Sequence, residues 1–169
     1  VLRRRSGTAA AGAQAGARGA RAPGASTMDS TLDAVLQAVC TTCDFEHGEA
    51  LVPCEDQGVV VQSGASFCST SGSADFHRAS RSFCLPPNVC VPGRVWHTQH
   101  AEWHQDSSQL PTSIFLRAEI AELSGLKACC CIPLVRGGLV LAVCAFYSSK
   151  IVPYSDGAIE LVMRSANEA

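Results

Sequence analysis

Apolar residues recur along the chain with two different periods. In the first stretch they are spaced three and four positions apart, which is typical of an amphipathic helix with one buried face. Asp29 or Ser30 can cap this helix, and the pattern ends near Thr42. The apolar stripe consists of Leu32, Val35, Leu36, Val39 and Cys40.

Shorter apolar runs predict β-strands. The first two cover residues 49–53 and 58–62, with turn residues between them, and the second continues into a Ser/Gly-rich loop within 63–74. The clearest signal is a pair of long runs, 127–135 and 139–147, joined by Arg136-Gly137-Gly138. Glycines at that junction suit a hairpin turn. Both runs are apolar on both faces, so we expect them in the centre of a covered sheet.

The other expected elements alternate between short helices and turns. The first of them are a helix over 75–83, a turn at Pro92-Gly93, a helix over 94–97 and a strand over 102–104. A further helix follows, capped by Thr112 or Ser113, with Leu116, Ile120 and Leu123 on one face. The last element is a terminal helix capped by Ser155. This order predicts an α+β domain, with a central, mostly antiparallel sheet and flanking helices.

Charge divides the 169 residues into two parts. Residues 1–27 contain five Arg, no acidic residue and almost no large apolar side chain, so we expect a disordered tail. Its composition fits an organelle transit peptide, or alternatively a segment upstream of a true start at Met28. Residues 28–169 carry a net charge of about −7 and form the expected domain. An acidic domain repels phosphates, so direct nucleic-acid binding is not expected. No apolar run is long enough to span a membrane.

Ten cysteines are present, and a disulfide framework is not the expected use of them. Cys129, Cys130 and Cys131 are consecutive in a strand, so their side chains alternate between faces. We interpret most of the cysteines as reduced, small buried apolar residues. Reduced cysteines favour the cytoplasm or another reducing intracellular compartment, or an organelle if the tail is a transit peptide.

Four stretches resemble a known family. They are DFEHGEALVP (44–53), FHRASRSF (76–83), VPGRVWHTQHAEWHQD (91–106) and FLRAEIAELSGLKACCCIPLVRGGLVLAV (115–143). In this order they are similar to GAF domains, especially the subgroup found beside PAS domains in sensor kinases and regulators, and the likeness covers residues 30–169. Three features depart from the family pattern. Cys90 stands where Gly is common, Leu51 stands where Trp is common, and the triple cysteine holds a strand position that is often small or aromatic.

The resemblance implies a ligand pocket between the sheet and a lid formed by the segments after the second strand. Candidate lining residues are Trp96, Trp103, Phe115, Arg117 and Cys131. Arg117 can pair with an anionic group on a ligand, or it can be a solvated helix residue. The ligand is not identified by the sequence, and a tetrapyrrole or another small molecule would fit the family. The amphipathic terminal helices allow a homodimer.

The residues themselves offer weak signals for catalysis or metal binding. His97, His100 and His104 have helical spacing but fall in a helix end and a strand, so we predict no metal site. Cys40-x-x-Cys43 lies at the end of a helix, where the dipole opposes thiolate formation. We therefore predict a non-catalytic sensory or regulatory domain in signal transduction. The alternatives are a ligand-free protein-interaction module, or a redox enzyme similar to free methionine sulfoxide reductase that uses Cys84 and Cys90.

Overall fold

A computed structural model of the chain describes residues 27–168. The tail predicted for residues 1–27 lies outside this range, apart from Thr27, which begins the first helix. The described elements are α1 (Thr27–Cys43), β1 (His47–Cys54), η1 (Glu55–Gln57), β2 (Val59–Cys68), α2 (Ser71–Ser80), α3 (Cys90–Thr98), β3 (Glu102–His104), η2 (Ser107–Gln109), α4 (Ala118–Leu123), β4 (Ala128–Arg136), β5 (Leu139–Ser148) and α5 (Asp156–Glu168).

Five strands form one sheet in the order β2-β1-β5-β4-β3, and all neighbouring strands are antiparallel. The predicted α+β class is confirmed. β4 and β5 form the expected hairpin, in which Gly137 and Gly138 adopt positive φ. The strands that read as apolar on both faces occupy inner positions of the sheet, as predicted. No helix within residues 27–168 is long and apolar enough to cross a bilayer.

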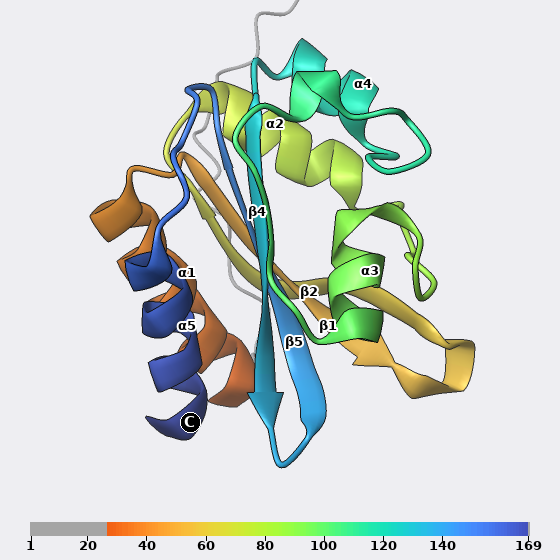
Figure 1. Cartoon of the computed structure of the whole chain (residues 1–169), viewed down its shortest axis with the longest axis vertical. Helices are drawn as coiled ribbons and strands as arrows, with labels where there is room; N and C mark the ends of the chain where they lie inside the picture. The colour runs from red at the N-terminus through yellow and green to blue at the C-terminus, as the bar shows by residue number, and fades with distance from the viewer. Residues whose placement is uncertain (1–26, 169) are drawn as a thin grey trace, which may run out of the picture.

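Helices cover both faces of the sheet (Figure 1). α1 and α5 lie side by side on one face, while α2, α3 and α4 lie over the other. Each face has its own apolar core, and strand alternation divides the triple cysteine between them: Cys130 joins the α1/α5 core, whereas Cys129 and Cys131 join the opposite core. All ten cysteines are free, and the predicted alternation is confirmed.

Four helix starts differ from the sequence-based prediction. α1 begins at Thr27, so Asp29 and Ser30 lie inside the helix instead of capping it. α2 begins at Ser71, inside the predicted loop, because Thr70 and Ser73 form a reciprocal capping box. α3 begins at Cys90, so Pro92-Gly93 lies in its first turn instead of in a separate turn. α4 begins only at Ala118, later than a cap at Thr112 or Ser113 would place it.

The apolar stripe predicted for α4 is also wrong as a core face. Leu116 and Leu123 are 49% and 82% exposed, and Ile120 is half-buried. Arg117 is turned inward instead and is only 2% exposed. There Arg117 forms an ion pair with Glu49 of β1.

The Pro-Gly in α3 has a packing role. A Cβ on Gly93 would lie 2.2 Å from the carbonyl oxygen of Pro86, so only glycine allows this approach of helix and loop. Cys90, at the position where the family commonly has Gly, has φ of +58°, in the left-handed region that favours glycine.

Candidate functional site

A group of polar side chains lies buried between the sheet and the helices α2 and α4. We call it the buried polar cluster, and its members are His47, Glu49, Gln62, His77, Arg117 and Tyr147. β1, β2 and β5 supply four members, α2 supplies His77, and Arg117 directly precedes α4. His47 and Glu49 share a face because they are two residues apart in a strand.

An ion pair forms the centre of the buried polar cluster. Arg117 Nη1 donates to Glu49 Oε1 at 2.5 Å, and both side chains are almost fully shielded from solvent. Tyr147 Oη accepts a hydrogen bond from Arg117 Nη2 and donates to Glu49 Oε1 at 3.2 Å. Burial raises the pKa of Glu49, but the charges and hydrogen bonds of Arg117 and His47 together outweigh it and lower this pKa well below its ordinary value. Glu49 is therefore ionised.

The guanidinium of Arg117 also contacts aromatic rings. Its Cζ atom lies 5.1 Å from the ring centroid of Phe76 and 5.4 Å from that of Tyr147. Phe115 stacks on Tyr147 with ring centroids 6.4 Å apart. Arg117 is thus held by charge, hydrogen bonds and aromatic faces together.

The rings of the two histidines of the buried polar cluster lie edge to face, with their centroids 5.5 Å apart. His47 Nδ1 lies 2.9 Å from the carbonyl oxygen of Phe67 and 3.3 Å from Cys68 Sγ, and its Nε2 lies 3.7 Å from Glu49 Oε2. Burial lowers the pKa of His47, but the contacts with Cys68 and Glu49 more than offset this and raise the pKa to about 9. Burial lowers the pKa of His77.

Gln62 connects this part of the buried polar cluster. Its Nε2 donates to Glu49 Oε2 at 2.5 Å and to His77 Nδ1 at 3.1 Å. Within residues 27–168, the side chains of His47, Glu49 and His77 offer metal-ligand atoms that all lie within 4.8 Å of one another.

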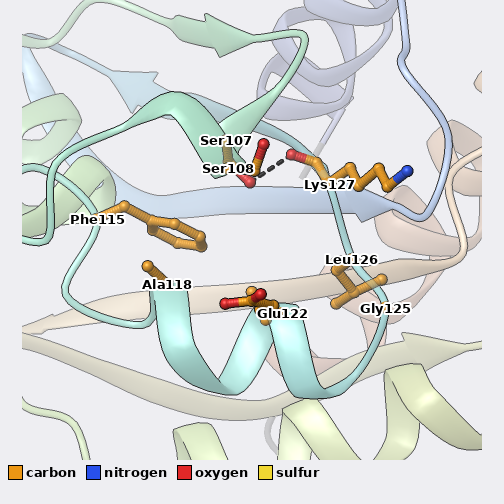
Figure 2. Close-up of a pocket in the computed structure, with 9 residues that line it drawn as sticks. Ser107, Ser108, Phe115, Ala118, Glu122, Gly125, Leu126 and Lys127 are labelled. Atoms are coloured by element: carbon orange, nitrogen blue, oxygen red, sulfur yellow. Dashed lines mark hydrogen bonds between the residues drawn. The ribbon is translucent and has the colours of Figure 1, made fainter.

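A cavity of about 260 Å³ lies beside the buried polar cluster. Figure 2 shows it between α4, the segment that precedes α4, and the start of β4. Ser107 Oγ donates to the backbone carbonyl of Lys127 across one side of it. The lining residues are Ser107, Ser108, Phe115, Ala118, Ala121, Glu122, Gly125, Leu126 and Lys127.

Four of the five pocket residues suggested by the sequence lie on the side of the sheet covered by α2, α3 and α4, but only Phe115 lines the cavity. Phe115 lines the cavity, Arg117 and Cys131 are buried on the same side of the sheet, and Trp96 is half-buried against that core. Trp103 lies on the opposite face, among the residues of the α1/α5 core.

Trp103 has a structural role there. Its Nε1 donates to the carbonyl oxygen of Val152 at 2.9 Å, and its ring packs against Phe45 and Tyr154. The sheet separates it from the cavity, because β3 directs alternate residues to opposite faces.

Sequence reasoning missed most of the buried polar cluster. His47 and Glu49 alternate at a strand period within an otherwise apolar run, and that pattern could have indicated a polar group on one face. Gln62, His77 and Tyr147 gave no comparable signal, because their neighbours come from other elements.

The histidines and cysteines considered from the sequence do not form a site in the structure. His97 and His100 are exposed, and His104 Nε2 lies 3.2 Å from Glu102 Oε2. Burial raises the pKa of Cys40, Cys43 and Cys90, so these thiols are protonated at neutral pH.

Known proteins that match this chain in sequence profile or in structure have the same fold. The profile of the family described as "GAF domain" matches residues 25–169. No curated protein matches the chain. Solved structures that match include a GAF domain of a phosphoenolpyruvate-protein phosphotransferase from Acinetobacter, at 11% identity and a TM-score of 0.62, with 84% of this chain and 79% of that chain covered.

Two further matches represent different functions. A domain of a putative two-component sensor histidine kinase from Sinorhizobium meliloti 1021 is 17% identical, with a TM-score of 0.62 and coverage of 85% and 88% of the two chains. Free methionine-R-sulfoxide reductase from Neisseria meningitidis, solved with its substrate, is 12% identical, with a TM-score of 0.61 and coverage of 82% and 73%. At these identities the likeness shows the fold alone.

Proposed function

Because the chain belongs to the GAF domain family, we propose that it is a regulatory domain that senses a small molecule in signal transduction and has no catalytic activity of its own. The observation that carries this proposal is the cavity beside Phe115, on the face of the sheet covered by α2, α3 and α4. Concave sites with an apolar floor and a few polar groups are the usual form of small-molecule sites.

The lining of the cavity indicates the kind of ligand. Phe115, Ala118, Ala121 and Leu126 give an apolar surface, while Ser108 and Glu122 supply polar and acidic groups, and the Lys127 side chain extends away from the cavity (Figure 2). Its volume of about 260 Å³ is below the range of drug-sized pockets, roughly 300–1,000 Å³. We therefore favour a compact polar or zwitterionic metabolite of amino-acid size over a tetrapyrrole.

The surroundings of the cavity supply a route for a signal. Phe115 stacks on Tyr147 of β5, and Arg117, at the N-terminal end of α4, is paired with Glu49 of β1. A ligand that shifts α4 therefore acts on two inner strands of the sheet. α1 and α5 pack on the other face of those strands, so the shift can reach the terminal helices.

A thermal-shift screen tests the proposal with amino acids, nitrate, formate and cyclic nucleotides as compounds. We expect one of the compact compounds to stabilise the domain, by about 2.7 kcal/mol at 100 times its Kd. Ala118→Leu places a larger side chain in the cavity and should remove this stabilisation while the domain stays folded. Leu123→Gln, on the same helix but 82% exposed, should retain it.

Two outcomes would contradict this proposal: no compound stabilises the domain, or the stabilisation persists in Ala118→Leu. Either would favour the second candidate function, a ligand-free protein-interaction module. That candidate has its own supporting observation, because Leu116, just before α4, and Leu123, at the end of α4, are exposed and could contact a protein partner.

Dimerisation through the terminal helices stays a proposal. Met28 of α1 and Met163 of α5 are 41% and 42% exposed, which leaves some apolar surface on these helices. Multi-angle light scattering over a range of concentrations measures the mass directly. We expect a dimer that Met163→Glu converts to a monomer, and a single-copy mass for the unchanged domain would contradict it.

A further inference from the structure

We propose that the buried polar cluster binds a divalent first-row transition-metal ion, such as Zn²⁺ or Fe²⁺, with His47, Glu49 and His77 as its protein ligands. The ligand atoms of these three side chains all lie within 4.8 Å of one another. The inference is independent of the Phe115 cavity and does not rest on the function proposed for it.

The donor set has the chemistry of known metal centres. Two imidazoles and one carboxylate bind zinc in catalytic sites and non-haem iron in facial triads, and in both cases a coordination position stays open. Imidazole nitrogen is a poor ligand for Mg²⁺ and Ca²⁺, which prefer all-oxygen sites. The set therefore selects a transition ion and leaves room for a water or a small exogenous ligand.

His47 is oriented as a metal ligand. Its ring is fully buried, and Nδ1 donates to the carbonyl oxygen of Phe67 at 2.9 Å. Metal-bound histidines usually make such a bond with the nitrogen that does not coordinate, because the bond fixes the ring. Nε2 points toward Glu49 Oε2 at 3.7 Å, and it has no hydrogen-bond partner although it is buried. An ion at this point would replace the Nε2 proton and satisfy the nitrogen.

The side-chain amide of Gln62 lies where the proposed ion would bind. Its amide NH₂, a positively polarised group, lies between Glu49 Oε2 and His77 Nδ1 and donates to both. The Oε1 atom of the same amide is buried without a partner. Rotation of the amide would withdraw the NH₂ and present Oε1 to the ion as a fourth oxygen or nitrogen ligand.

The Oε2 atom of Glu49 can take this role in place of the hydrogen bond that it accepts from Gln62. Arg117 and Tyr147 both bond Oε1, which fixes the carboxylate and leaves Oε2 directed toward the histidines and Gln62. Hydrogen bonds of this kind commonly orient ligating carboxylates. His77 and Gln62 are half-buried, so an ion can enter from the side of α2.

Metal titration of the full chain, stripped with a chelator under reducing conditions, tests the proposal. Co²⁺ is the probe, because its absorption distinguishes nitrogen and oxygen ligands from thiolates, and the chain has ten cysteines. We expect one equivalent of Co²⁺, visible ligand-field bands, no thiolate charge-transfer band, and displacement by Zn²⁺ but not by Mg²⁺.

His77→Gln is the main variant because His77 is half-buried and the domain should fold without it. We expect binding at least tenfold weaker in this variant and unchanged binding in the control His100→Gln, whose ring is exposed. Circular dichroism and a melting curve without metal confirm that both variants are folded.

The proposal is overturned by absence of Co²⁺ binding, by a thiolate charge-transfer band, or by equal Co²⁺ affinity in His77→Gln. None of these outcomes bears on ligand binding at Ala118, so the two proposals fail separately.

Discussion

At the scale of single residues, Arg117 shows how one side chain can reverse the orientation of a segment. Leu116 and Leu123 are seven positions apart and would normally turn inward on one helix face, yet both are exposed and Arg117 is buried. The burial of a charge is costly unless the charge is paired and hydrogen-bonded. Glu49, Tyr147 and the face of Phe76 meet these conditions together.

The replacement Arg117→Met should therefore lower the free energy of unfolding by about 3–5 kcal/mol, because Glu49 keeps a buried charge without its partner. The double variant Glu49→Gln/Arg117→Met should recover much of the loss. Urea unfolding measures both. The control Arg78→Met removes the exposed pair with Asp75 and should cost about 1 kcal/mol or less. A similar small cost for Arg117→Met would show that the buried pair has little effect on stability.

At the scale of elements, backbone contacts set where helices can lie. α3 approaches the loop before it so closely that Gly93 has the Pro86 carbonyl oxygen where a side chain would begin. The same loop is joined to β2 by paired backbone hydrogen bonds between Val60 and Leu85. The position of α3 over the sheet thus depends on one glycine.

Gly93→Ala should lower the free energy of unfolding by about 1–3 kcal/mol or more, because a Cβ 2.2 Å from a backbone oxygen forces the helix away from the loop. The matched control is Gly157→Ala in α5. That position has no close backbone contact, and alanine favours a helix over glycine by up to about 1 kcal/mol. In thermal unfolding we expect Gly93→Ala to lower the melting temperature and Gly157→Ala to raise it. An unchanged melting temperature for Gly93→Ala would contradict the close approach of helix and loop.

At the scale of the whole molecule, the sheet separates two cores that differ in composition. The α1/α5 core is almost entirely apolar, whereas the other side also holds the buried polar cluster. The cavity beside Phe115 lies on that second side, and another cavity, lined by Trp103 and Tyr154, lies on the α1/α5 side. A structural change on one side can therefore reach the terminal helices on the other through the strands that both sides share. This arrangement suits a regulatory domain, and it does not depend on a reactive thiol.

We expect no turnover of free methionine sulfoxide with a thioredoxin reductant. Burial raises the pKa of Cys90 and keeps this thiol protonated, while a reductase needs a nucleophilic thiolate. An NADPH-coupled assay measures the rate. A rate above background that Cys84→Ser or Cys90→Ser abolishes would establish the enzyme alternative instead.

The sequence by itself determined the local structure and the class of fold. The apolar stripe of α1 and the β4–β5 hairpin follow from periodicity and turn residues, and their burial agrees with the prediction. The alternation of Cys129, Cys130 and Cys131 between two faces follows from the strand period in the same way. These features need only neighbours along the chain, so a linear pattern contains them.

Only the tertiary structure decided the candidate site. Arg117 and Glu49 are 68 residues apart, and no local pattern indicates that they pair. Trp103 lies in a short strand whose register sends it to the face opposite Phe115. His47, Glu49 and His77 meet because α2 packs over β1, and which helix covers which face depends on the packing of the whole domain. Burial of a polar group depends on partners from distant segments, and these partners exist only after the chain has folded.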